Sequence, residues 1–190
     1  MTFPQSVTTC MQNEAEAPDE KLISLIQDGE SQTFAILVER YRAKSLRVAY
    51  GILHNRADAE DAVQEAFIRV YRSLNRFMGA GRFTSWLYRV VINESLRLLK
   101  AMRTGPDEMD AEYAPACEGV DAEQVMLVRQ CLAALPEKLR VVLALRGVDE
   151  LDYAEIASIL SIPVGTVRSR LHEARRMFAG HWKGMMQDEM

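Results

Sequence analysis

Helical periodicity dominates this sequence of 190 residues. Apolar residues recur every three or four positions over long stretches, for example over residues 34–52 and 62–74. No stretch shows the alternation of apolar and polar residues that is typical of a half-buried strand. Proline, which breaks helices, is absent from residues 19–105. These patterns predict an all-α fold.

Charge is distributed in blocks that the net charge of −4 conceals. Residues 21–101 carry a net +5 and residues 126–180 a net +2, whereas the first 20 residues carry −4 and residues 102–125 carry −6. Basic blocks of this kind favour binding to a polyanion, although chance clustering on solvated faces would look the same. Both Pro106 and Pro115 fall in the second acidic stretch, which is typical of a linker.

We therefore predict two small helical domains joined by an acidic linker. The predicted parts are an acidic N-terminal tail (1–20), a first domain (21–103), the linker (104–124), a second domain (125–182) and a C-terminal tail (183–190).

Three helices are predicted in the first domain. The first covers residues 34–52. Asp58 can cap the second helix, which ends near Leu74, and Thr84 or Ser85 can cap the third, which ends near Met102.

The third helix carries a polar stripe opposite its apolar face. Arg89, Asn93, Arg97 and Lys100 share this stripe with the large ring of Trp86. Cations suit phosphates, a ring suits base stacking and an amide suits a base edge. The stripe therefore predicts binding of an unpaired base, with a solvated face and a half-buried tryptophan as the alternative.

Two helices separated by a short turn are predicted near the end of the second domain. They follow an amphipathic helical stretch over residues 132–145, within which Pro136 can start a helix at its first turn. A short helix over residues 156–160 leads into the turn Ser161–Pro163, and a second helix covers Val164–Phe178. This layout is typical of a helix-turn-helix whose second helix enters the major groove, with an ordinary helical hairpin as the alternative. Serine stands at position 161, where most such turns have glycine.

Four segments in this order resemble bacterial RNA polymerase sigma factors of the small, two-domain extracytoplasmic-function group, and most closely the envelope-stress sort. The segments are DAEDAVQEAFIRVYRSLNRF, FTSWLYRVVIN, LPEKLRVVLALR and YAEIASILSIPVGTVRSRL. The resemblance covers residues 21–180. It implies core RNA polymerase and promoter DNA as partners, together with an anti-sigma factor. It further implies a monomer when the chain is free and a 1:1 complex with the inhibitor.

The resemblance also implies roles for individual residues. The helix bearing Asp61, Gln64 and Glu65 would dock on the polymerase. The loop from Met78 to Ser85 and the helix after it would hold and melt the minus-10 element, through Arg82, Trp86, Arg89, Asn93, Arg97 and Lys100. The acidic linker would thread toward the active-site channel of the polymerase. The last predicted helix would read the minus-35 element through Thr166, Arg168, Ser169, Arg170, His172, Glu173 and Arg176.

Two residues depart from the family pattern. Many relatives carry an acid where this chain has Arg97, and many carry arginine where it has Glu173. A carboxylate facing DNA repels phosphate, although it can accept a hydrogen bond from a cytosine amine. Promoter preference near Glu173 therefore stays open.

Other classes of protein find less support. A stand-alone helix-turn-helix regulator remains the alternative. We expect no enzyme, because GxxxxGK[ST], HExxH and GxSxG are absent, and we expect no cofactor or metal site, because the histidines lack ligand spacing.

Location and redox state follow from what the sequence lacks. No apolar run approaches the length of a membrane span and no signal peptide is visible, so we expect a cytoplasmic protein. In that compartment Cys10, Cys117 and Cys131 are expected to be reduced thiols, with a switch between Cys117 and Cys131 as the alternative.

Overall fold

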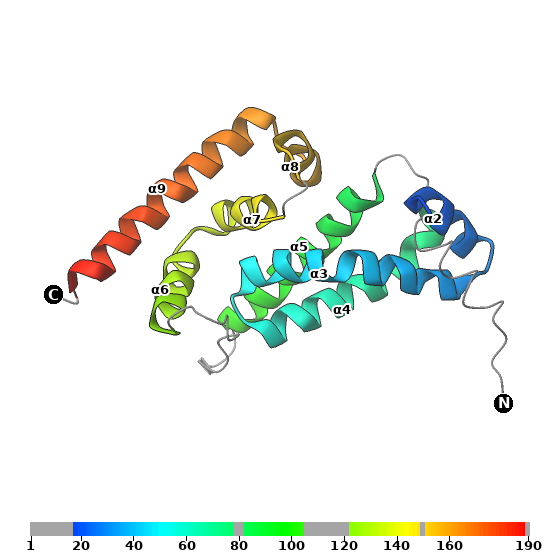
Figure 1. Cartoon of the computed structure of the whole chain (residues 1–190), viewed down its shortest axis with the longest axis horizontal. Coiled ribbons are helices and arrows are strands. Elements are labelled where there is room, and N and C mark those ends of the chain that lie inside the picture. Colours follow the sequence, from blue (N-terminus) through cyan, green and yellow to red (C-terminus); the bar gives the residue numbers. More distant parts are fainter. Residues whose placement is uncertain (1–16, 78–81, 105–121, 149–150, 189–190) are drawn as a thin grey trace.

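The computed structural model describes residues 17–77, 82–104, 122–148 and 151–188, and every regular element in these ranges is helical (Figure 1). The prediction of an all-α fold is confirmed. The helices are α2 (Asp19–Gln27), α3 (Phe34–Leu53), α4 (Arg56–Ser73), α5 (Phe83–Thr104), α6 (Ala122–Ala133), α7 (Glu137–Arg146), α8 (Tyr153–Leu160) and α9 (Val164–Asp188), with the short 3-10 turns η1 (Ser31–Thr33) and η2 (Leu74–Arg76). Most of the predicted linker lies outside the described residues.

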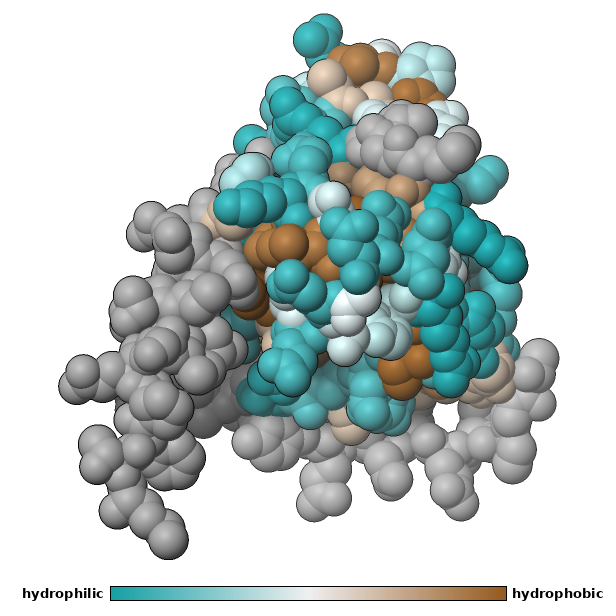
Figure 2. Space-filling model, turned by 90° about the vertical axis from the view of Figure 1, so that its right-hand side faces the viewer, coloured by the Kyte–Doolittle hydropathy of each residue, from teal (hydrophilic) through white to brown (hydrophobic). Residues whose placement is uncertain are grey.

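Helices α3, α4 and α5 pack against one another along their lengths, and α2 lies at one end of this bundle (Figure 1). The faces that meet are the predicted apolar ones, with Val48, Ile52, Val70 and Leu87 fully or almost fully buried. The end of the molecule at which α2 lies shows a largely hydrophilic surface with separate apolar patches (Figure 2). Helix α2 was not predicted from the sequence.

Helices α8 and α9 form the predicted helix-turn-helix. Asp152 caps α8 in a capping box with Glu155, and each side chain accepts the backbone N–H of the other residue. Helix α9 is longer than predicted, because it continues past Phe178 to Asp188 and packs along α6. The rings of Phe178 and Trp182 stack at 6.3 Å within this extension.

Other helix boundaries also differ from the sequence predictions. Helix α8 begins at Tyr153, before the predicted start at residue 156. Asn55, not Asp58, caps α4, since its side chain accepts the backbone N–H of Asp58 at 3.2 Å. Neither Thr84 nor Ser85 caps α5, because the helix already begins at Phe83. The stretch predicted over residues 132–145 contains parts of two helices, because α6 ends at Ala133 and Pro136, which has no N–H to donate within a helix, is the N-cap residue of α7.

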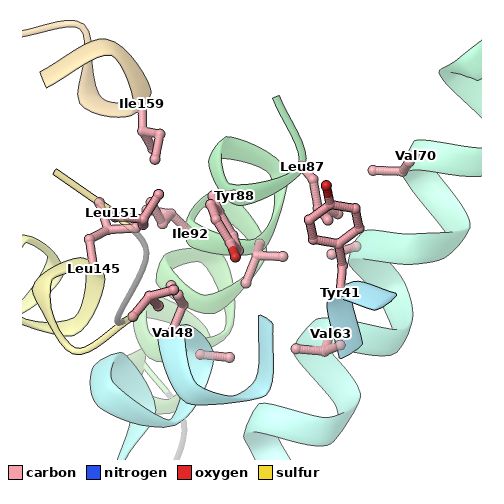
Figure 3. Packing of buried hydrophobic residues seen from close by; sticks show 14 of the residues in the cluster. Tyr41, Val48, Val63, Val70, Leu87, Tyr88, Ile92, Leu145, Leu151 and Ile159 are labelled. Carbon is pink, nitrogen blue, oxygen red and sulfur yellow. The ribbon is translucent and has the colours of Figure 1, made fainter. Parts of the chain in front are cut away.

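Apolar side chains of the two domains meet in one continuous core. Figure 3 shows Ile159 of α8, Leu145 of α7 and Leu151 close to Ile92 of α5 and Val48 of α3. Close approach of α3 and α7 depends on Gly51, since a Cβ atom there would lie 2.8 Å from the Cβ of Ala144. A side chain at position 51 would therefore push the domains apart.

Serine at position 161 adopts the left-handed conformation, with φ 54° and ψ 46°. Glycine adopts this conformation without the steric cost that a Cβ atom brings. We expect Ser161→Gly to raise the free energy of unfolding by about 0.5–1 kcal/mol, after subtraction of the greater entropy of glycine in the unfolded chain. Chemical denaturation followed by circular dichroism measures this change.

Ser158→Gly provides the matched control, because Ser158 is exposed within the right-handed helix α8. Glycine there should lower stability by about 0.5 kcal/mol, the difference in helix propensity between serine and glycine. A loss of stability in both variants would contradict the role assigned to the left-handed turn.

Candidate nucleic-acid interface

The polar stripe predicted on α5 exists, but the second domain covers part of it. Arg89 donates from Nε to the carbonyl of Ile159 at 2.7 Å, and its Nη2 donates to the carbonyl of Ser158. Arg82, just before α5, forms an ion pair with Glu155 of α8. Two of the cations assigned to minus-10 DNA are therefore bound to the first helix of the helix-turn-helix.

Trp86 belongs to an aromatic cluster formed by Phe77, Phe83 and Trp86. The ring of Trp86 stacks on that of Phe77 with centroids 5.0 Å apart and an angle of 23°, and its edge contact with Phe83 spans 5.9 Å. Its side chain is half-buried, as the alternative interpretation of the stripe predicted. Aromatic rings are the side chains on which bases stack, although Phe77 already covers one face of the Trp86 ring.

Asn93 is exposed and lines a cleft of about 460 Å³ between the domains. Arg89 shares the α5 wall of this cleft, while Arg170 of α9 and residues of α7 and α8 form the opposite wall. The fold thus brings together residues assigned to the minus-10 and minus-35 elements. Lys100 is exposed farther along α5.

Arg97 lies with the residues assigned to polymerase docking. A chain of ion pairs runs from Glu65 to Arg69 at 3.1 Å, from Arg69 to Glu94 at 3.0 Å and from Glu94 to Arg97 at 2.8 Å. Glu94 is 3% exposed, and its hydrogen bond raises the pKa of Arg97. These pairs tie α4 to α5.

Three residues of this chain of ion pairs, Glu65, Glu94 and Arg97, also border a depression of about 270 Å³. Asp61, Gln64 and Glu65 line it together with Ile68 and Arg97. The three residues assigned to polymerase docking are therefore brought together on one face of α4.

Helix α9 presents its predicted polar face to solvent. Val167, Leu171 and Ala174 are buried against the rest of the domain. The exposed residues of the predicted set are Arg168, Ser169, His172, Glu173 and Arg176, whereas Thr166 and Arg170 are half-buried. This face is free of the contacts that hold α5.

Arg140 joins the domains, although the sequence analysis gave it no role. It is 3% exposed, and its guanidinium donates to the carbonyl of Ile52 at 3.1 Å, of Ala133 at 2.6 Å and of Leu135 at 2.9 Å. Ile52 lies in the last turn of α3, where the helix dipole favours a cation. A signal was present in the sequence, since position 140 falls within the apolar run of α7.

His54 lies beside this contact, as the left-handed residue that ends α3. Burial, with smaller contributions from Arg140 and Arg129, lowers the pKa of His54 from 6.5 to about 4. The imidazole is therefore neutral at pH 7. Arg129 also lies over the ring of Tyr50, with its guanidinium carbon 5.8 Å from the ring centroid, which is a contact between α6 and α3.

The part of the chain that the structure describes contains no group of three or more histidine, cysteine, aspartate or glutamate side chains that could hold a metal ion. None of its helices combines the length and the apolar character that a membrane span requires. Cys131 is buried with its Sγ 3.8 Å from the Sδ of Met185, and burial raises the pKa of its thiol. Cys10 and Cys117 lie outside the described residues.

Comparison with known families matches both domains. The Sigma-70 region 2 family matches residues 37–104, and the Sigma-70 region 4 family matches residues 126–178. The RNA polymerase sigma-H factor of Pseudomonas aeruginosa is 39% identical over 83% of this chain and 90% of its own length. The ECF RNA polymerase sigma-E factor of Escherichia coli is 36% identical over the same shares.

Solved structures agree on the fold. CnrH, solved in complex with the cytosolic domain of CnrY, superposes with a TM-score of 0.68 at 22% identity, over 87% of this chain and 97% of that one. The sigma factor RpoE of Bartonella quintana, solved with the anti-sigma factor NepR, gives 0.61 at 22% identity, over 77% and 96%.

The matched regions and the curated relatives define a class of transcription initiation factor with two helical domains. The chain belongs to the RNA polymerase sigma factors, in their extracytoplasmic-function (ECF) group.

Stability should depend on pH through His54. The pKa of His54 is lower in the folded chain than in the unfolded chain, so below pH 6.5 the unfolded chain binds a proton that the folded chain does not. The free energy of unfolding is therefore unaffected by this residue above pH 6.5 and decreases as the pH falls from 6.5 toward 4. Between pH 7 and pH 5 we expect the wild type to lose about 1–2 kcal/mol more stability than His54→Asn, which does not titrate and tolerates the left-handed conformation. Urea denaturation at both pH values measures this difference.

His172→Asn is the control, since His172 is exposed on α9. This variant should keep the pH dependence of the wild type. Equal pH dependence in the wild type and His54→Asn would show that His54 is not the group responsible.

Proposed function

We propose that this chain binds core RNA polymerase in the cytoplasm and directs it to promoters, without catalysing a reaction itself. The observation that carries the proposal is that regions 2 and 4 of the sigma-70 family occur in one chain, each with its polar face on a long helix. A stand-alone regulator would need only the helix-turn-helix.

The two DNA contacts have different tasks in this proposal. Helix α9 reads minus-35 duplex in the major groove through its exposed face, of which Arg168 and Ser169 are part. Trp86 and Asn93 capture minus-10 bases once these have left the duplex stack. Arg82, Arg89 and Lys100 contribute positive charge near the phosphates.

Docking on the polymerase uses the face of α4 that carries Asp61, Gln64 and Glu65. Two carboxylates on this face repel phosphate, which favours a protein partner over DNA. Glu94 of α5 forms ion pairs with Arg69 of α4 and with Arg97, and these pairs hold α4 against α5 next to the docking face. Arg97 lies at its edge, and we therefore assign Arg97 to both the docking face and the minus-10 stripe.

In the structure α8 lies on α5, and we call this the closed arrangement. Helix α8 must leave α5 before the minus-10 element binds. Arg89 and Arg82 are occupied by α8, and Asn93 faces the cleft between the domains. Polymerase that binds the separated domains more tightly would shift the chain toward the open state. An anti-sigma factor that binds the chain 1:1 would keep it from binding polymerase. The sigma factor RpoE of Bartonella quintana was solved in complex with such a partner, the anti-sigma factor NepR.

Substitutions of Arg168 and Asn93 should have separable effects on transcription. Arg168→Ala removes a groove contact worth about 1–3 kcal/mol, so minus-35 binding should weaken. Asn93→Ala should leave duplex binding nearly normal and impair strand opening, because flipping a base costs a few kcal/mol that pocket contacts must return. Run-off transcription and permanganate footprinting with reconstituted holoenzyme measure both steps.

A template mismatched across the minus-10 region provides the decisive comparison. It should rescue much of the Asn93→Ala defect and little of the Arg168→Ala defect. Equal rescue of both variants, or of neither, would contradict the division of tasks between α5 and α9. Promoter binding by the free chain as tight as that by holoenzyme would favour a stand-alone regulator.

A further inference from the structure

Helix α2 precedes both matched regions, yet its side chains contact the segments that carry the aromatic cluster. Leu22, Ile23 and Ile26 anchor α2, since each is at most 6% exposed. Its two ends carry the polar side chains Asp19 and Gln27. Gln27 reaches the segment that carries Phe77, which is the first side of the cluster, and Asp19 reaches, through Tyr41, the segment that carries Phe83, which is the other side.

Gln27 holds the first side. Its Nε2 atom donates to the carbonyl of Leu74 at 2.9 Å and to the carbonyl of Phe77 at 3.0 Å. The second carbonyl belongs to the residue whose ring stacks on Trp86. One side chain of α2 therefore fixes the backbone beneath that stack.

Asp19 holds the other side through Tyr41. The Tyr41 hydroxyl donates to the Asp19 carboxylate and lies 3.3 Å from Oγ1 of Thr84, while its ring packs on Phe83 at 5.6 Å. Burial and the bond to Asp19 raise the pKa of Tyr41 to about 12, so the hydroxyl stays protonated. Arg40 completes the arrangement with an ion pair to Asp19.

We propose that α2 positions the aromatic cluster for capture of a minus-10 base, with Gln27 and Asp19 as positioning residues. The proposal rests on the function proposed above. A stacking surface must be held in a fixed orientation to be effective, and residues behind it provide that support. Neither residue needs to touch DNA.

The first test measures binding of holoenzyme to a labelled single-stranded oligonucleotide. The oligonucleotide carries the non-template minus-10 sequence of a promoter that the wild-type holoenzyme transcribes. Gln27→Ala should weaken this binding about three- to tenfold, because two hydrogen bonds to the Phe77 segment are lost. Affinity for core polymerase and for a minus-35 duplex should stay unchanged. Gln32→Ala, at an exposed position of η1, is the matched control.

A second test separates positioning from general stability. Asp19→Ala should weaken oligonucleotide binding, whereas Asp19→Asn should recover much of it, since an amide oxygen can still accept the Tyr41 hydrogen bond. In a Trp182→Phe background Trp86 is the sole tryptophan. In the free chain, the emission spectrum of Trp86 should shift in Gln27→Ala and Asp19→Ala. It should stay the same in Gln32→Ala as in the Trp182→Phe background.

The inference fails if Gln27→Ala binds the oligonucleotide like the wild type. It also fails if affinity for core polymerase and thermal stability fall in parallel with oligonucleotide binding, because α2 would then support the whole domain and not the cluster. A wild-type holoenzyme unable to bind the oligonucleotide would overturn the proposed function itself, and this inference with it.

Discussion

The guanidinium of Arg140 binds three backbone carbonyls at the point where α3, α6 and the start of α7 meet. Carbonyls at helix ends lack partners within their own helix, and a buried cation satisfies them at the negative end of the dipole. Gly51 and Ala144 pack beside this contact because neither carries a large side chain. The arrangement of the two domains depends on this junction, since the junction sets the approach of α7 to α3 and thereby the place of α8 on α5.

This arrangement has a direct consequence for activity. Arg89 and Arg82 belong to the stripe for which we propose DNA binding, and both are occupied by α8, through two backbone carbonyls and the carboxylate of Glu155. A ligand shifts such an equilibrium only by the difference between its affinities for the two states. In the proposed function, polymerase must therefore recognise a form in which α8 has left α5, while the exposed face of α9 needs no such change.

The sequence predicted the individual helices better than the contacts between them. Periodicity located α3, α4 and α5, and Pro136 marked the start of α7, because both signals act within a few residues. Helix α2 was not predicted, because a helix of nine residues with three buried apolar side chains has only a weak helical periodicity in its sequence. The contacts of Arg89 with α8 and of Arg140 with α3 were beyond prediction, since they join residues 70 and 88 positions apart. Of the predicted α5 stripe, Arg89 and Asn93 line the cleft between the domains, whereas Arg97 lies beside residues of α4, and only the fold could reveal these different neighbours.

One measurement tests the closed arrangement most directly. Spin labels at two exposed positions, 42 on α3 and 175 on α9, would report the separation of the domains in a background without Cys10 and Cys117. Pulsed electron paramagnetic resonance should give one narrow distance distribution for the free chain and a longer distance once core polymerase is added. A free chain that already shows the long or broad distribution, or a distance that polymerase leaves unchanged, would contradict the account.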